Sequence, residues 1–272
     1  MAELLTTLVV AFGLLTLTWL VSLARGDASV VDIAWGLGFV LIGWAIYLRL
    51  ADSQLWSTIL LGMVTAWGPR LSIHIARRNL GHGEDYRYQK MREKSPQTFG
   101  RDSLFKVFYL QGVLMTIVSL PLQWGISRPP IAGILPVIGL ALYLVGLFFE
   151  SVGDWQLARF KTDPAKKDRV MDQGLWRYTR HPNYFGDFCV WWGIYLVALA
   201  AGHWWTIVGP LVMSALLMKY SGAGLLEKTI GRRRPGYDEY VARTNGFFPG
   251  PPNRAKRRRS LNRVDSREDR GP

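Results

Sequence analysis

Residues 131–158 read IAGILPVIGLALYLVGLFFESVGDWQLA, and Glu150 and Asp154 are the only charged residues in this run. Crossing the hydrocarbon core of a bilayer takes about 20 apolar residues in a helix, so the run predicts a transmembrane helix. Six further stretches qualify or nearly qualify, at residues 4–24, 30–50, 55–76, 104–124, 184–201 and 203–221. The sequence therefore predicts an all-α, polytopic integral membrane protein with seven transmembrane helices.

The positions of the basic residues predict the orientation of these helices. If the amino terminus is outside, the cytoplasmic segments are 25–29, 77–103, 159–183 and everything from 219 onward, and they hold 1, 7, 7 and 14 Lys and Arg residues, 29 of the 33 in the chain. The outer loops hold only Arg49 and Arg128. By the positive-inside rule, we expect the amino terminus outside and the carboxyl terminus in the cytoplasm. The net charge of +13 then has a membrane explanation, and we expect no nucleic-acid partner.

The end of the chain differs from the rest. Residues 250–272 are rich in Pro, then in Arg and Lys, and have too few apolar side chains to offset the entropy lost on ordering. We expect a membrane domain at residues 1–249 and a disordered, basic cytoplasmic tail at 250–272. Its basic run at 254–259 would attract anionic membrane lipids.

Polar side chains recur inside the predicted spans, where ionisable groups are costly and are functional candidates by default. They are Asp32 in the second span, Arg70 and His74 in the third, Glu150, Asp154 and Lys161 along the fifth, Asn183 and Asp187 in the sixth, and Lys219 in the seventh. Most of them fall toward the cytoplasmic ends. As a set they predict a polar cavity open to the inner leaflet, although a single Lys219 or Arg78 could equally extend its charge to the interface.

Three predicted cytoplasmic loops mix cations, glycines and aromatic rings. They cover residues 77–88, 174–187 and 232–240. Arg side chains such as Arg180 suit phosphate groups, and Tyr and Trp suit stacking on a heterocycle. The loops predict either a site for a phosphorylated, base-containing cofactor or contacts with anionic lipid. The glycines at 36–38 and 222–224 lack the spacing of a dinucleotide fingerprint and predict close helix packing instead.

Residues 174–187, GLWRYTRHPNYFGD, resemble the signature of the steroid 5α-reductase family, in particular its bacterial branch. The segments at 32–36, 70–77 and 233–249 are similar as well, so the resemblance covers roughly residues 30–249. It implies a seven-helix membrane bundle in a bacterial inner membrane. NADPH would bind on the cytoplasmic side, and a lipid-like substrate would enter from the bilayer. The resemblance implies neither a metal site nor an oligomeric partner.

The resemblance also implies which residues contact NADPH. By position in the motifs and by the loop chemistry above, these are Asp154, Lys161, Tyr178, Arg180, Asn183, Tyr184, Asp187, Lys219, Tyr237 and Tyr240.

The implied reaction is reduction of the C=C bond of an α,β-unsaturated ketone, with an acid that polarises the carbonyl oxygen. In the steroid enzymes a Gln-Glu pair and a Tyr form this group. This chain departs from that pattern, because its nearest carboxylate is Asp32 and the position approximating the Tyr is His74. We expect His74 to be the catalytic donor, oriented or charged by Asp32, because a His–Asp couple titrates near neutral pH.

Two alternatives remain open on the sequence. The core of the motif, residues 180–186, also occurs in isoprenylcysteine and phospholipid methyltransferases, which use S-adenosylmethionine. Those enzymes would prefer a Glu-Glu pair after the last span, where this chain has Glu227 followed by Lys228. A non-enzymatic lipid-binding protein would explain the basic tail but not the aligned polar groups. The sequence therefore favours the reductase.

Overall fold

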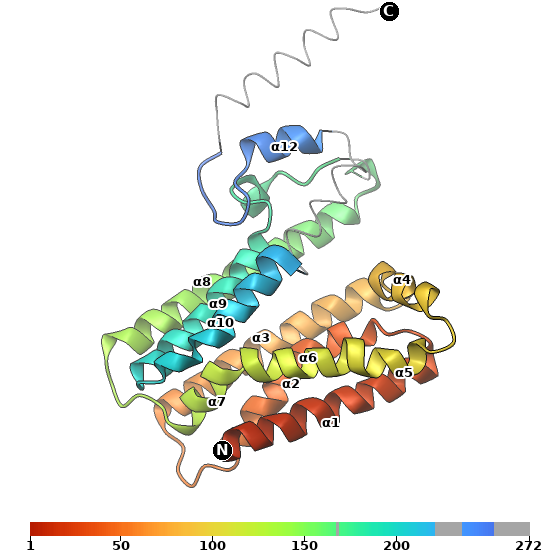
Figure 1. Ribbon diagram of the computed structural model, residues 1–272. Coiled ribbons are helices and arrows are strands. Elements are labelled where there is room, and N and C mark those ends of the chain that lie inside the picture. The colour runs from red at the N-terminus through yellow and green to blue at the C-terminus, as the bar shows by residue number, and fades with distance from the viewer. Residues whose placement is uncertain (167–168, 221–235, 253–272) are drawn as a thin grey trace, which may run out of the picture. The chain divides into compact units, whose positions relative to one another are not determined.

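The computed structural model describes residues 1–166, 169–220 and 236–252 (Figure 1). These residues are helical and contain no strand; one isolated parallel β-bridge joins Thr179 to Asn245. The chain divides into two compact units, with unit 1 formed by residues 1–143 and 191–212 and unit 2 by residues 144–190 and 213–272. The predicted all-α class is thus confirmed. The expected disordered tail comprised residues 250–272, of which 253–272 lie outside the described ones.

In the part of the chain that the structure describes, four helices are long and apolar enough to cross a membrane: α1 (Ala2–Arg25), α2 (Val30–Tyr47), α3 (Leu55–Asn79) and α8 (Ile134–Lys161). The later part of the chain adds α9 (Pro182–Ala200), then η4 (Trp204–Ile207), α10 (Val208–Ala215) and the π-helix η5 (Leu216–Tyr220). The apolar helix that runs over Trp204–Lys219 is shorter than the four long ones. The protein is membrane-embedded by the length and composition of these helices.

The predicted span at 104–124 is bent. It comprises α5 (Phe99–Ser103), the π-helix η1 (Leu104–Tyr109), α6 (Leu110–Val118) and α7 (Leu120–Ser127), with a 46° bend between Val118 and Leu120. Pro121 in the first turn of α7 explains the bend, because proline lacks an N–H and its ring clashes with the carbonyl four residues earlier. If the two parts on either side of the bend, Phe99–Val118 and Leu120–Ser127, are counted as one span, the described residues contain five candidate spans.

In unit 1, glycines let α2 pack against α3. A Cβ on Gly36 would lie only 2.5 Å from the carbonyl oxygen of Gly68, so the two backbones touch where both residues lack side chains. The predicted packing role of Gly36 is confirmed. Next to this crossing, the rings of Phe39, Trp67 and Trp191 form a buried aromatic cluster, with centroids 4.6–5.8 Å apart. Edge-on packing of this kind adds to the burial of the rings.

In unit 2, glycines bring α8 and α9 equally close. A Cβ on Gly146 would lie 2.6 Å from the carbonyl oxygen of Gly186, and a Cβ on Gly186 would lie 2.4 Å from the backbone nitrogen of Glu150. Small residues at such crossings allow the backbone contact on which membrane helix packing depends. This close seam determines which polar side chains of the two helices meet.

Candidate functional site

The seam between α8 and α9 carries a carboxylate and an amide that bind each other. Asp154 on α8 is buried, and its Oδ1 accepts a hydrogen bond of 3.0 Å from Nδ2 of Asn183 in the first turn of α9. The Asn183 Oδ1 accepts from the backbone N–H of Tyr184 at 3.1 Å, which fixes the orientation of the amide. Gly153 makes the pairing possible, because a Cβ there would lie 3.2 Å from the backbone nitrogen of Asn183. The sequence predicted both residues as cofactor ligands, and the structure brings them together.

Two further carboxylates lie one helical turn deeper. Glu150 precedes Asp154 by one turn on α8, and Asp187 follows Asn183 by one turn on α9. These residues are only 2% and 7% exposed, and carboxylates that are buried to this extent usually have partners. The spacing of four residues predicted that Glu150 and Asp154 share one face of α8 and that Asn183 and Asp187 share one face of α9. Glu150, Asp154 and Asp187 are buried and Asn183 is half-buried, which agrees with that prediction.

The loop before α9 is docked on the end of α8. The backbone N–H of Leu175 donates to Oε1 of Gln156 at 3.0 Å, and the indole N–H of Trp176 donates to the carbonyl of Gly153 at 3.0 Å. Gly174 has a φ of 59°, and a Cβ there would lie 2.3 Å from the Gln156 amide. Residues 174–176, at the start of the motif at 174–187, therefore position the loop beside the Asp154–Asn183 pair.

The same loop is anchored from the other side by the segment after α12 (Tyr237–Arg243). The hydroxyl of Thr179, which is fully buried, donates to the carbonyl of Phe247 at 2.8 Å. The N–H of Arg180 donates to the carbonyl of Asn245 at 2.9 Å, and the N–H of Gly250 donates to the carbonyl of Tyr178 at 3.1 Å. No sequence pattern predicted this anchor, although residues 247–249 lie in a segment that resembles the steroid 5α-reductase family.

The remaining predicted cofactor residues of unit 2 fall into two groups. Tyr237 and Tyr240 are buried, and the Tyr240 hydroxyl donates to the carbonyl of Trp176 at 2.6 Å. Burial, followed by the charges around it, raises the pKa of Tyr240 above its ordinary value, so the phenol stays protonated and keeps this bond. The Tyr240 hydroxyl therefore holds α12 against the loop.

The second group is more accessible: Tyr178, Lys161 and Lys219 are exposed, and Arg180, Asn183 and Tyr184 are half-buried. Tyr184 also stacks on His181, with ring centroids 5.6 Å apart. The cations at 232–234, which the sequence placed in a third cofactor loop, lie outside the described residues. Within the described ones, Asp154, Asn183, Arg180 and Tyr178 form the candidate site of unit 2.

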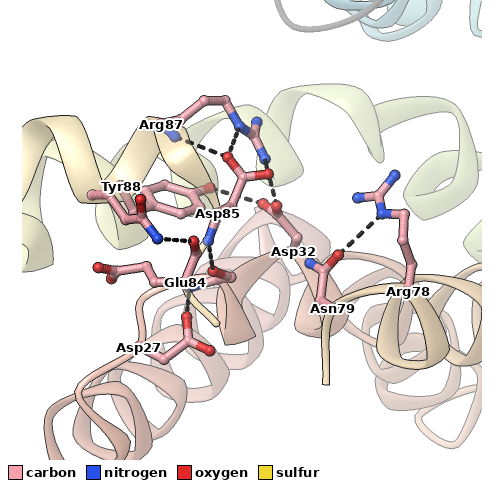
Figure 2. A network of polar contacts seen from close by, with 10 residues as sticks. Asp27, Asp32, Arg78, Asn79, Glu84, Asp85, Arg87 and Tyr88 are labelled. Carbon is pink, nitrogen blue, oxygen red and sulfur yellow. Dashed lines mark hydrogen bonds and ion pairs between the residues drawn. The ribbon is translucent and has the colours of Figure 1, made fainter. Parts of the chain in front are cut away.

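Unit 1 contains a separate polar cluster around Asp32, at the start of α2. The Arg87 guanidinium contacts Oδ2 of Asp32 at 2.6 Å, and the Tyr88 hydroxyl donates to Oδ1 at 2.8 Å. Figure 2 shows Arg87 pointing toward both Asp32 and Asp85, the N-cap of α4 (Tyr86–Lys94). We call Asp32, Asp85, Arg87 and Tyr88 the loop clamp, because they tie the segment after α3 to the start of α2.

The charges of the loop clamp support one another. Burial alone would raise the pKa of Asp85, but hydrogen bonds from the Arg87 side chain and backbone N–H lower it below its ordinary value. Burial and the neighbouring charge of Asp32 raise the pKa of Tyr88 well above its ordinary value. Asp85 therefore contributes stability above its ordinary pKa of 3.8, which is lost as the pH falls through the lowered value. Tyr88 contributes stability below pH 10 that is lost at higher pH.

The clamp changes the expectation for the predicted catalytic pair. Both carboxylate oxygens of Asp32 accept hydrogen bonds from the segment at 87–88, 55 and 56 residues away in the sequence. His74 is half-buried on α3 in the same unit. The orientation of His74 by Asp32 stays a prediction. The observed contacts of Asp32 show that this carboxylate holds the segment at 87–88. The sequence singled out the loop at 77–88 for its cations, but did not indicate that Arg87 would bind a carboxylate of this chain.

A family model described as "Protein of unknown function (DUF1295)" matches residues 18–244 of this chain. The chain belongs to this family. The DUF1295 family includes steroid 5α-reductase-like proteins. An uncharacterised protein of Schizosaccharomyces pombe is 26% identical over an alignment 278 residues long, which covers 89% of this chain and 78% of the yeast protein. No solved structure matches the chain.

The DUF1295 match includes residues of both units. It begins within α1 and ends just after α12, so it contains the loop clamp, the Asp154–Asn183 pair and the docked loop at 174–181. The segment at 245–250 that anchors this loop follows directly after the match. Both polar clusters described above thus belong to the part of the chain that carries the family resemblance.

Proposed function

We propose that this DUF1295 protein is an NADPH-dependent reductase of the C=C bond of an α,β-unsaturated ketone in a steroid-like or other lipid substrate. The observation that carries the proposal is the Asp154–Asn183 hydrogen bond beside a loop that is docked on both sides. Membership of a family that includes steroid 5α-reductase-like proteins supports the reductase class.

The residues of unit 2 fit the chemistry of NADPH. A carboxamide needs both a hydrogen-bond donor and an acceptor, and Asn183 and Asp154 offer an amide and a carboxylate. Phosphate groups need cations, which Arg180 and Lys161 supply, and the exposed ring of Tyr178 suits stacking on a base. When bound, NADPH would supply the hydride. The chain itself would bind and orient the cofactor and exclude water.

The reaction also requires a group that polarises the substrate carbonyl while negative charge develops on its oxygen. We assign this role to His74, whose imidazole can donate a proton near neutral pH. His74→Ala should abolish lipid-dependent oxidation of NADPH. The matched control is His203→Ala, because His203 binds the carbonyl of Arg128 and has no part in the proposal. Full turnover by His74→Ala would remove His74 from the mechanism.

A ligand-binding experiment tests the function before any substrate is identified. A ligand at 100 times its dissociation constant stabilises a protein by about 2.7 kcal/mol. We expect NADPH to raise the thermal unfolding temperature of the detergent-purified protein, whereas S-adenosylmethionine leaves it unchanged. Stabilisation by S-adenosylmethionine alone would support the methyltransferase alternative, whose diagnostic position, Glu227, lies outside the described residues. A response to neither compound would favour a non-enzymatic lipid-binding protein.

The proposal places the site on the cytoplasmic face of a bacterial inner membrane, in a bundle of seven spans with the amino terminus outside. This orientation rests on the positive-inside distribution of Lys and Arg. Cys189 is the single cysteine, so Cys189→Ser provides a background for reporter cysteines. A membrane-impermeant maleimide should label Ser53→Cys in intact cells and Ala165→Cys only in inverted vesicles. The reverse pattern would invert the topology.

A further inference from the structure

Unit 1 contains a cavity that no part of the proposed function uses. It has a volume of about 170 Å³ and lies between the end of α4 and the start of the bent span. Its polar lining consists of Lys94, Ser95, Asp102, Ser103 and Lys106, and Met91 and Phe99 form its apolar part. Sites for drug-sized ligands measure about 300–1,000 Å³, so this cavity is suited to part of a larger molecule.

The wall that α4 contributes to this cavity is held in place by several contacts. The Arg92 side chain donates two hydrogen bonds to the carboxylate of Glu84, at 2.8 and 2.9 Å. Its guanidinium lies 4.4 Å from the centroid of the Phe99 ring, on the lining of the cavity. The loop clamp, through Arg87 and Asp32, fixes the first turn of the same helix. These contacts fix the side of the cavity that α4 forms.

The charges on its lining suit a single negative charge. Lys94 and Lys106 are cations, and Asp102 is the one carboxylate among the lining residues, so their formal sum is +1. Lys106 contacts Asp102 at 2.9 Å, and its ammonium group has two further N–H donors. Both lysines are exposed, so they do not bury an isolated charge. A phosphodiester carries one negative charge and matches this lining.

An apolar strip continues from the cavity along the bent span. Phe105, Leu110 and Val113 are 61%, 52% and 46% exposed. Phe105 lies in the π-helix η1, and Leu110 follows this helix directly as the first residue of α6; π-helical turns occur frequently at functional sites. In a span that crosses the bilayer, this strip faces the acyl chains, while the lysines at its end reach the level of the headgroups.

We propose that the cavity binds the phosphodiester headgroup of a membrane phospholipid, with Lys94 and Lys106 on the phosphate and the strip at Phe105 and Leu110 along an acyl chain. The site is independent of the proposed reductase activity. A soluble phosphate compound offers the same anionic chemistry without acyl chains. The apolar strip favours the lipid, and the experiment separates the two sources.

Native mass spectrometry of the purified protein with added phosphatidylglycerol tests the site. The Lys94→Gln/Lys106→Gln variant should bind the lipid about thirtyfold more weakly than the unmodified protein, because each lysine near an anionic lipid contributes about a fivefold factor. Lys90→Gln is the matched control, since Lys90 is an exposed lysine on α4 that does not line the cavity. Both sets of substitutions are at the surface, and unfolding curves without lipid should coincide.

Two results would overturn the proposal. One is equal binding of phosphatidylglycerol by the double variant and the Lys90→Gln control. The other is displacement of the lipid by glycerol 3-phosphate at equal concentration, which would assign the cavity to a soluble phosphate compound. If the protein also fails to bind NADPH, that failure bears on the proposed function and leaves the lipid result unaffected.

Discussion

Replacing Asp154 by alanine is expected to remove most of the thermal stabilisation that NADPH gives to the purified protein. Asp154 is buried and accepts the hydrogen bond that orients the Asn183 amide, so alanine removes a charged partner and leaves the amide misplaced. Hydrogen bonds to charged groups contribute about 1.5–3 kcal/mol, which corresponds to an affinity about ten to a hundred times weaker. The stabilisation should then fall from about 2.7 kcal/mol to between about 0.4 and 1.4 kcal/mol at the same NADPH concentration.

The matched control for this change is Asp163→Ala. Asp163 lies just after α8 and pairs at the surface with Lys166, at 2.8 Å. Its loss should leave the response to NADPH unchanged. If Asp154→Ala and Asp163→Ala respond to NADPH as strongly as the unmodified protein does, Asp154 has no role in cofactor binding.

The largest loss of stability is expected from Gly186→Ala. The added Cβ would lie 2.4 Å from the backbone nitrogen of Glu150 and 2.6 Å from the carbonyl oxygen of Gly146, and no flexible side chain can move aside. Overpacking costs about 1–3 kcal/mol and occasionally more, and here two helix backbones must separate. Unfolding in denaturant with the protein in detergent should show a decrease of at least this size in the free energy of unfolding.

Gly62→Ala provides the comparison for this prediction. Gly62 is also inside a long helix, α3, but a Cβ there would meet nothing within 4 Å. The substitution should therefore leave the free energy of unfolding unchanged or raise it slightly, because alanine favours the helix over glycine. Equal effects of the two substitutions would show that α8 and α9 are not packed through Gly186.

The helices of this DUF1295 protein could be predicted from the sequence because each helix is specified by residues that are close together in the chain. A run of apolar residues is sufficient to predict a helix in a membrane, where every backbone group must find its partner within the segment. The apolar run at 131–158 became α8, and the spacing of Glu150 and Asp154 correctly predicted that they share a face. The bend near Pro121 could also have been predicted, since proline is a known cause of such bends.

The contacts of the polar side chains were less predictable, because they depend on how distant segments meet. Asp32 is tied to Arg87 and Tyr88, across more than 50 residues, and no periodic pattern indicates that pairing. Thr179 is anchored by the carbonyl of Phe247, a backbone group that carries no sequence signal. Tyr240 has the residue type of a stacking platform, but its ring is buried and its hydroxyl binds the chain itself.

Backbone hydrogen–deuterium exchange with and without NADPH tests the central claim most directly, because it shows where the cofactor binds as well as whether it binds. We expect NADPH to slow the exchange of the amides at residues 176–184, in the docked loop and the first turn of α9. The amides at 84–92, around the loop clamp, should exchange at the same rate in both samples. Unchanged exchange at 176–184 with saturating NADPH, or protection there by S-adenosylmethionine instead, would contradict the proposed reductase.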